Sequence, residues 1–244
     1  MNTPVVQVLI HGASGRMGRA LLRLASQRDD LQVVAAVSLS GAPIAEAGPV
    51  PVLPAAMLGE APEFDVAIDF SLPEAFDGLL AVCVNRGQAL LSGTTGLSAA
   101  QDAALAAAGE RIPVMWAANY SAGVAVLAEL VRQAAAALPG WDADVIEAHH
   151  IHKKDAPSGT ALLLGQAVVA GRGRAPHFAS LRAGDIVGEH TVQLSGSGER
   201  LELVHRATHR DIFACGALDA ALRLARLGPG RRDFGALLLA GSRR

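Results

Sequence analysis

The stretch His11-Gly12-Ala13-Ser14-Gly15-Arg16-Met17-Gly18 decides the fold of the N-terminal half. It lies between an apolar run at 5–10, typical of a strand, and a helical pattern over 17–28. In such a loop the first glycine permits a tight turn, the second lets backbone N–H groups approach an anion, and the third lets the helix pack closely on the sheet. The spacing G-x-x-G-x-x-G predicts a binding site for a dinucleotide pyrophosphate at the start of the helix. A glycine-rich turn without a ligand is the alternative.

Apolar runs alternate with helical patterns through the first half of the chain. Strands are predicted at 5–10, 31–39, 64–70, 89–91 and 113–117, and helices at 17–28, 74–86 and 98–110, with an irregular connection over 41–62. This alternation favours a parallel sheet with helices on both faces. Together with the glycine loop it predicts an α/β, Rossmann-type dinucleotide-binding domain over 1–119 and 211–244.

The segment 120–210 has a different pattern. A helix is predicted at 122–138, followed by a strand that ends at His149-His150 and a helix from Ser158. Further strands are predicted near 179–182, 188–194 and 200–207, and a helix over 212–226 returns the chain to the first domain. Strands that cluster in this way indicate a smaller α+β domain with a mixed sheet, which we expect to bind substrate.

Bulk properties exclude several classes of function. The chain has 244 residues, 51% of them hydrophobic, and a formal net charge of −2, which argues against a general nucleic-acid-binding surface. The start at 1–4 lacks a positive segment and the run 5–10 is too short for a signal peptide or a membrane span, so we expect a cytoplasmic protein without membrane contacts. Cys83 and Cys215 lack metal-type spacing and are predicted to be buried small hydrophobic residues.

Two features bear on the choice of nicotinamide cofactor. The second strand ends in Ser38-Leu39, where an acidic residue usually binds the adenosine ribose hydroxyls. Without that carboxylate, and with Arg16 able to reach a 2′-phosphate, the sequence weakly favours NADPH or the use of both NADPH and NADH. Ser38 as an ordinary strand-end residue is equally open. The loop Ser92-Gly93-Thr94-Thr95-Gly96 follows a strand and is predicted to lie on the nicotinamide side, with a plain turn as the alternative.

The block from Glu147 to Thr160 concentrates cationic groups. Three histidines lie within 149–152, two lysines follow at 153–154, and a helix begins near 158–160. This combination predicts an anion site for an acidic substrate. A histidine beside a lysine is also suited to donate a proton after hydride transfer. Chelation of a metal by His150 and His152, or a solvated basic strand end, are the alternatives; because the lysines repel cations, we expect no metal.

The sequence resembles the dihydrodipicolinate reductase family, also called 4-hydroxy-tetrahydrodipicolinate reductases. The resemblance rests on the glycine loop, 93–96, 117–121, the block 147–160 and the segment 182–191. It implies an enzyme that uses NADPH or NADH to reduce a small cyclic dicarboxylate in diaminopimelate and lysine biosynthesis. It also implies a homotetramer assembled through the sheets of the second domain.

The resemblance also implies roles for particular residues. His149 would be the proton donor, with Lys153 as its cationic partner, and His150, Gly159 and Thr160 would hold substrate carboxylates. The implied cofactor contacts are Gly12, Ala13, Ser14, Gly15, Arg16, Met17, Ser38, Gly93, Thr94, Thr95, Ala117, Ala118, Asn119 and Tyr120. The chain departs from the family at Ser38-Leu39, where Glu-Arg is common, and at Tyr120, where phenylalanine is common. The rival hypotheses are a Rossmann dehydrogenase active on linear substrates and an NAD(P)-sensing module that would tolerate loss of the His-Lys cluster.

Overall fold

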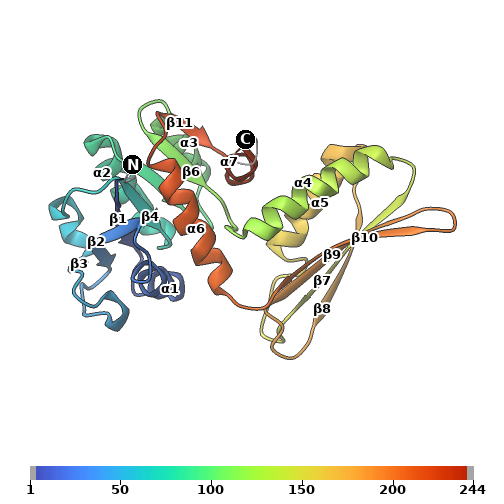
Figure 1. The fold of residues 1–244 in the computed structure, drawn as a ribbon, viewed down its shortest axis with the longest axis horizontal. Helices are drawn as coiled ribbons and strands as arrows, with labels where there is room; N and C mark the ends of the chain where they lie inside the picture. The colour runs from blue at the N-terminus through green and yellow to red at the C-terminus, as the bar shows by residue number, and fades with distance from the viewer. Residues whose placement is uncertain (1–3, 241–244) are drawn as a thin grey trace. The chain divides into compact units, whose positions relative to one another are not determined.

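The computed structural model describes residues 4–240, and its contacts divide the chain into two units (Figure 1). The first unit contains the residues up to Tyr120 and those from Phe213, and the second runs from Ser121 to Ile212. The sequence places these boundaries at 119/120 and 210/211. Residues 1–3, part of the segment inspected for a targeting signal, and 241–244, at the end of the predicted first domain, lie outside the described residues.

Within the described residues, the first unit is built on a seven-stranded parallel sheet with the order β11-β6-β5-β4-β1-β2-β3. The strands are β1 (Val6–His11), β2 (Leu31–Ser38), β3 (Val52–Pro54), β4 (Val66–Asp69), β5 (Ala89–Ser92), β6 (Pro113–Trp116) and β11 (Gly230–Arg232). The strand order reverses between β1 and β4. In an open parallel sheet this reversal leaves a crevice at the carboxyl edge, where ligands bind. The Rossmann-type prediction is confirmed.

Helices cover both faces of this sheet. They are α1 (Arg16–Ala25), α2 (Pro73–Arg86), α3 (Ala99–Ala108), α6 (Asp211–Leu224) and α7 (Phe234–Ala240). Because right-handed crossovers leave β1 and β4 in opposite directions, α1 lies on one face and α2 and α3 lie on the other. Two residues define the ends of α2: Pro73 occupies the first turn, and Gly87 ends the helix with a left-handed φ of 71°.

Three expectations for the first unit need correction. The connection 41–62 is not irregular throughout, because Val52–Pro54 forms edge strand β3 against β2 and two short 3₁₀ segments, η1 (Ala45–Ala47) and η2 (Ala55–Glu60), flank it. Strand β11 and helix α7 were not predicted. Cys83 is buried in α2, but Cys215 is exposed, because it shares with Asp219 and Arg223 the i, i+4 stripe of α6 that faces solvent.

The second unit places two helices on one face of a mixed sheet (Figure 1). Its elements are α4 (Ala122–Ala137), β7 (Asp142–His149), α5 (Gly159–Arg172), β8 (His177–Arg182), β9 (Gly188–Ser195) and β10 (Arg200–Ala207). The order is β10-β9-β7-β8, with β7 and β8 parallel and the other pairs antiparallel, as the mixed-sheet prediction requires. Val145 and Val192 pair across β7 and β9 and pack against Val131 of α4 and Val168 of α5. The other face exposes Leu181 and Val204.

The helices of the described part of the chain were also searched for membrane spans. None is long and apolar enough to cross a bilayer.

Candidate active site

The glycine loop after β1 has the close contacts that its three glycines predict. Gly12 has a φ of 77°, and a Cβ there would lie 2.5 Å from the carbonyl oxygen of Phe70. A Cβ on Gly18 would lie 2.4 Å from the Gly12 carbonyl oxygen and 2.5 Å from Ala13 Cα, whereas a Cβ on Gly15 would meet only the Gly12 oxygen, at 3.2 Å. The first and third glycines therefore close the turn and pack the helix, and the second leaves the outer side of the loop open.

The start of α1 is available to an anion. Gly15 is the N-cap and provides no side-chain hydrogen bond, and the first turn contains no acidic residue. Ser14, Gly15 and Arg16 are exposed, Met17 is half-buried and Ala13 is buried. Uncapped N–H groups and the positive end of the helix dipole suit a diphosphate, so the residues present fit a dinucleotide.

The end of β2 differs from the sequence-based picture of a hydroxyl offered to the cofactor. Ser38 is buried, and its Oγ accepts a hydrogen bond from the Gly41 N–H at 3.1 Å. Leu39 is 90% exposed. Glu46, in η1, accepts a hydrogen bond from Arg19 Nη1 of α1 at 2.9 Å. The end of β2 therefore offers an exposed apolar side chain in place of a carboxylate.

A buried carboxylate organises the second loop, which follows β5. Asp69, at the end of β4 and fully buried, accepts hydrogen bonds from Ser92 Oγ and Thr94 Oγ1, both at 2.8 Å, and lies 2.9 Å from His11 Nδ1. Burial alone would raise the pKa of Asp69, but the hydrogen bonds from His11, Ser71 and Ser92 outweigh it and hold that pKa below its usual value. The Thr94 hydroxyl is therefore engaged within the protein, and exposed Thr95 presents the outer side of this loop.

The segment after β6 packs on the same loop. The Tyr120 hydroxyl donates to the Ser92 carbonyl at 2.7 Å, and the Ala117 N–H donates to the same carbonyl at 3.2 Å. Burial raises the pKa of the Tyr120 phenol well above its usual value. The predicted cofactor residues at 12–17, 38, 93–95 and 117–120 thus follow β1, β2, β5 and β6. Because these strands are parallel, the residues lie at one edge of the sheet.

In the second unit, His149 ends β7 with its ring held from one side. His149 is 8% exposed, and its Nδ1 makes a short hydrogen bond with Glu147 Oε2. Arg182, at the end of β8, donates from Nη1 to Glu147 Oε2 at 3.0 Å and from Nη2 to Oε1 at 2.8 Å. Burial would raise the pKa of Glu147, but the hydrogen bonds from Arg182, Ser180 and His149 prevail and lower it to about 2. Glu147 is therefore an ionised carboxylate inside the unit.

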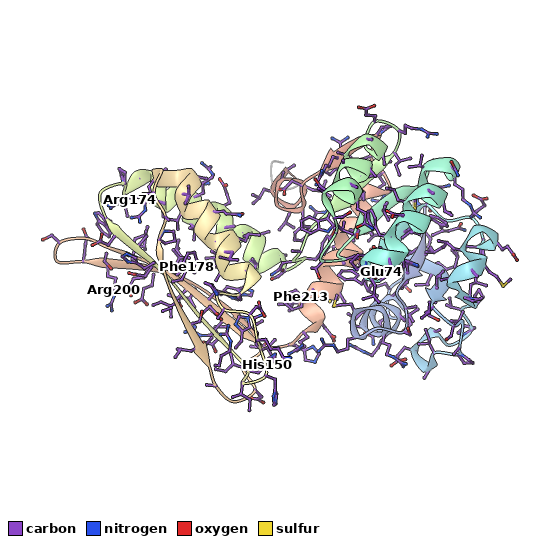
Figure 2. All side chains as sticks on the ribbon, turned by 180° about the vertical axis from the view of Figure 1, so that it is seen from behind. Glu74, His150, Arg174, Phe178, Arg200 and Phe213 are labelled. Carbon is purple, nitrogen blue, oxygen red and sulfur yellow. The ribbon has the colours of Figure 1, made fainter. Side chains whose placement is uncertain are left out.

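The other residues predicted to bind substrate follow His149 directly. Lys153 Nζ donates to Asp155 Oδ1 at 2.9 Å, and His150 lies beyond the end of the sheet (Figure 2). Burial, followed by the nearby charge of Arg210, lowers the pKa of His150. Gly159 and Thr160 form the first turn of α5, where the Ser158 hydroxyl caps the Ala161 N–H at 3.2 Å. The structure therefore brings the predicted substrate residues together between the end of β7 and the start of α5.

A second histidine lies behind His149. The ring of His190, on β9, has its centroid 5.2 Å from that of His149, and its Nε2 lies 3.1 Å from Ser158 Oγ. His190 is 4% exposed, and burial together with the neighbouring His149 lowers its pKa to about 4. His205, on β10, continues the row with its centroid 6.5 Å from that of His190. His190 is therefore a neutral side chain at neutral pH.

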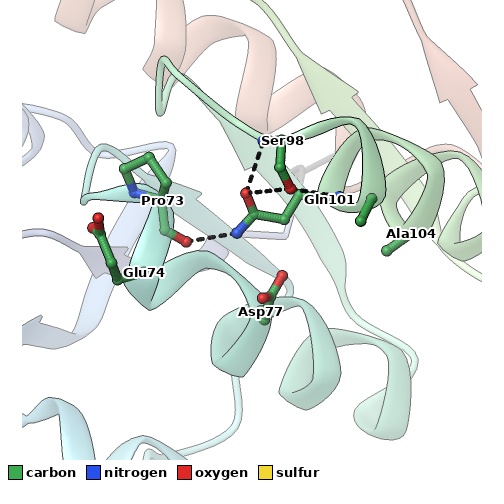
Figure 3. A pocket seen from close by; sticks show the side chains of 7 residues that line it. Pro73, Glu74, Asp77, Ser98, Gln101 and Ala104 are labelled. Carbon is green, nitrogen blue, oxygen red and sulfur yellow. Dashed lines mark hydrogen bonds between the residues drawn. The ribbon is translucent and has the colours of Figure 1, made fainter.

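Two other kinds of candidate site, a metal site and a surface hollow, contribute nothing to the assignment. Among residues 4–240, no group of three or more His, Cys, Asp or Glu side chains is arranged to hold a metal ion. A hollow between α2 and α3 is lined by Pro73, Glu74, Asp77, Ser98, Ala100, Gln101 and Ala104 (Figure 3). Gln101 Nε2 donates to the Pro73 carbonyl at 2.7 Å across it. The lining contains none of the predicted site residues.

The fold and these two clusters define a class: an NAD(P)-dependent oxidoreductase with a Rossmann-type unit and a second unit that carries a histidine-lysine site. Comparison with known proteins makes the assignment narrower. Residues 6–120 match the family model described as dihydrodipicolinate reductase, N-terminus, and residues 123–238 match the one described as dihydrodipicolinate reductase, C-terminus. The chain belongs to the dihydrodipicolinate reductase family, as the sequence motifs predict.

Curated relatives agree with the family models. The chain is 62% identical over 230 residues to 4-hydroxy-tetrahydrodipicolinate reductase of Xanthomonas campestris pv. campestris (strain B100), which covers 94% of this chain and 96% of that protein. It is 57% identical over 225 residues to the enzyme of the same name from Xylella fastidiosa (strain 9a5c), with 92% and 94% covered. The protein is thus an NAD(P)H-dependent reductase of lysine and diaminopimelate biosynthesis.

Solved structures share the fold. A dipicolinate-bound dihydrodipicolinate reductase from Paenisporosarcina sp. TG-14 superposes with a TM-score of 0.81 at 20% identity, covering 94% of this chain and 98% of that one. A diaminopimelate dehydrogenase from Corynebacterium glutamicum gives a TM-score of 0.61 at 13% identity, with 97% and 96% covered. At these identities the likeness establishes the two-unit architecture.

Sequence reasoning missed the residues that hold the site in place. The sequence analysis gives no individual role to Glu147, Arg182, His190 or Asp69. One signal was available: Ala143, Val145, Glu147 and His149 alternate on β7, so a strand whose inward positions are apolar ends with two inward polar residues. An ionisable side chain at an inward position needs a partner, which the sequence does not name.

Proposed function

We propose that the protein reduces 4-hydroxy-tetrahydrodipicolinate to tetrahydrodipicolinate, with the site at the end of β7 providing the proton. When bound, the nicotinamide would supply a hydride, which C4 of the cyclic, unsaturated dicarboxylic imine would accept after the 4-hydroxyl has left as water. His149 or Lys153 then adds a proton to the neighbouring carbon, so the substrate gains one hydride and one proton. The observation that carries this proposal is the pairing of nearly buried His149 with an ionised carboxylate, four residues from Lys153.

The anion site suits the two carboxylates of that substrate. We assign His150, Gly159 and Thr160 to carboxylate binding, because an imidazole N–H and the first N–H groups of a helix donate hydrogen bonds to carboxylate oxygens. Gly159 is exposed, and a Cβ there would meet nothing within 4 Å, so the first turn of α5 is open to a ligand.

For the cofactor we propose use of both NADPH and NADH, with some preference for NADPH. The predicted ribose site shows exposed Leu39 in place of a carboxylate, and exposed Arg16 begins α1. Glu46 is paired with Arg19, so it adds little repulsion toward a 2′-phosphate.

We also propose a cytoplasmic homotetramer assembled through the sheets of the second unit. Support comes from the face of that sheet opposite α4 and α5, where Leu181 of β8 and Val204 of β10, on the two opposite edge strands, are 59% and 40% exposed. A second copy of the same face would bury them. Sedimentation equilibrium tests this: a tetramer is expected, and a monomer for the variant L181E/V204E. A wild-type monomer at micromolar concentration would contradict the assembly.

The chemical proposal is tested by tracing both hydrogens. With cofactor deuterated at the transferable position, in ordinary water, we expect one deuterium at C4 of the product by NMR. With unlabelled cofactor in deuterated water, we expect deuterium at the neighbouring carbon. His149→Gln should lower kcat by roughly 10²-fold or more, the usual range for loss of a general acid. His177→Gln, at a side chain that is 89% exposed on β8, is the matched control and should leave kcat unchanged. An unchanged kcat in H149Q would remove His149 from the chemistry.

A further inference from the structure

Glu147 occupies a position where it controls the orientation of the His149 ring. It is 1% exposed, and both of its carboxylate oxygens are used: Oε2 by His149 Nδ1 and Arg182 Nη1, and Oε1 by Arg182 Nη2. A carboxylate that is ionised accepts hydrogen bonds only. The neighbouring His149 Nδ1 must therefore carry a hydrogen, which leaves Nε2 as the other nitrogen of the ring.

The opposite side of the ring is kept open by a glycine. Gly188, on β9, lies next to His149, and a Cβ built there would come within 3.1 Å of His149 Nε2 and 3.4 Å of its Cδ2. Any larger residue at this position would therefore crowd the nitrogen that Glu147 leaves available. Two elements of the sheet, β7 and β9, together present the same ring nitrogen.

Arg182 extends the same arrangement to the lysine segment. Beyond its two hydrogen bonds to Glu147, its Nε donates to the Lys153 carbonyl at 3.2 Å and its Nη2 donates to the Asp155 carbonyl at 2.5 Å. Lys153 in turn donates to Asp155 Oδ1 at 2.9 Å. The guanidinium thus connects the carboxylate behind His149 to the backbone of the segment 153–155, which carries the predicted cationic partner.

We infer that Glu147, fixed by the bidentate contact with Arg182, is a positioning residue that holds His149 with hydrogen on Nδ1 and directs Nε2 to the substrate. The charged and titratable groups around the ring come from every neighbouring element: Glu147 on β7, Arg182 on β8, His190 on β9 and Lys153 in the following loop. A carboxylate behind the imidazole also stabilises the imidazolium from which a proton is donated. This inference rests on the proposed role of His149 as proton donor.

The direct test is the ¹⁵N NMR spectrum of the full-length enzyme, with the His149 signals assigned by their loss in H149Q. In the pH range where the ring is neutral, we expect the Nδ1-protonated form in the wild type and loss of that preference in Glu147→Gln. Glu147→Gln keeps the side-chain volume but removes the charge. A wild-type ring with hydrogen on Nε2 would overturn the inference, and this readout does not depend on turnover or on any variant folding.

Kinetics give the second readout. For E147Q we expect kcat to fall by about 10- to 100-fold, the alkaline limb of the kcat–pH profile to move to lower pH, and the KM for NADPH to stay within about twofold. Arg182→Lys keeps a cation on Glu147 but loses the fork geometry, so it should lose less activity than E147Q. Asp144→Asn is the matched control, because Asp144 also lies on β7, within 3.5 Å of His177 on β8, away from the site.

The possible outcomes distinguish failure of the proposed role of His149 from failure of the inferred role of Glu147. If H149Q retains wild-type kcat, the proposed role of His149 fails. If H149Q is impaired while E147Q keeps both the wild-type kcat and its pH profile, the role of His149 stands and the positioning role of Glu147 is wrong. Equal losses in E147Q and D144N would show a general effect of charge on the sheet, which also contradicts the inference.

Discussion

Replacing Gly18 by alanine tests whether the tight loop geometry sets cofactor affinity. The new Cβ would lie 2.4 Å from the Gly12 carbonyl oxygen and 2.5 Å from Ala13 Cα. Both obstacles are backbone atoms, so no side-chain rotation relieves the contact, and an ordinary separation requires the loop to move by about 1 Å. The Gly12 carbonyl also accepts the Gly15 N–H at 3.0 Å, so the shift disturbs the turn that faces the diphosphate.

The expected magnitudes follow from two opposing effects. Alanine in a helix gains about 1 kcal/mol over glycine, but overpacking against backbone costs about 1–3 kcal/mol, so G18A should lower the free energy of unfolding by about 0–2 kcal/mol. Loss of one charge-assisted hydrogen bond to the diphosphate, about 1.5–3 kcal/mol, should raise the Kd for NADPH by about 10- to 100-fold.

The control is Gly78→Ala, in the interior of α2, where a Cβ would meet nothing within 4 Å. This variant should be stabilised by about 0.5–1 kcal/mol and bind NADPH like the wild type. Urea unfolding and fluorescence titration of NADPH measure both quantities. If G18A were stabilised as much as G78A, with an unchanged Kd, the reasoning about this loop would be refuted.

Two further predictions concern the second unit. Thr160→Val removes a hydroxyl from the open first turn of α5, so it should mainly raise the KM for the dicarboxylate substrate and change kcat little. Steady-state kinetics with varied substrate concentration measure both constants. A fall in kcat at unchanged KM would contradict the assignment of Thr160 to carboxylate binding. His190, whose pKa is about 4 when folded against 6.5 when unfolded, binds more protons in the unfolded state between these values, so stability falls as the pH drops through that window. Between pH 7 and pH 5 this lowers the free energy of unfolding by about 2 kcal/mol. In His190→Gln, urea unfolding at the two pH values should show a pH dependence that is smaller by this amount. A pH dependence like that of the wild type would show that His190 is not the group responsible.

The elements predicted from sequence are those with a clear period or clear end signals. Apolar runs, helical periodicity and the signals at Pro73 and Gly87 locate β1, β2, α2 and α3 closely. Strand β3 was missed because it ends in Pro54 and the segment 41–62 contains four other prolines; it pairs on one side only, which is how an edge strand tolerates proline. Strand β11 is Gly-Arg-Arg, without apolar residues, so only its pairing with β6 identifies it.

The site residues also divide into those that the sequence predicts and those that it does not. The residues from His149 to Thr160 are contiguous, so their concentration of positive charge is visible in the sequence. Their supports are not: Arg182 is 35 residues from Glu147, and Asp69 joins side chains from β1, β4 and β5. Such contacts depend on strand register, which places Glu147 opposite Ser180 and His190, and register is a property of the assembled sheet.

The measurement that tests the central claim most directly is oxidation of NADPH and of NADH, followed at 340 nm, with the substrate generated in place from pyruvate and aspartate semialdehyde by the condensing enzyme. We expect rapid oxidation that requires both precursors, occurs with both cofactors, and falls by roughly 10²-fold or more in H149Q at unchanged NADPH affinity. Cofactor binding without oxidation in the complete mixture would contradict the account, because it would leave a dinucleotide-binding unit whose partner unit does not reduce this dicarboxylate.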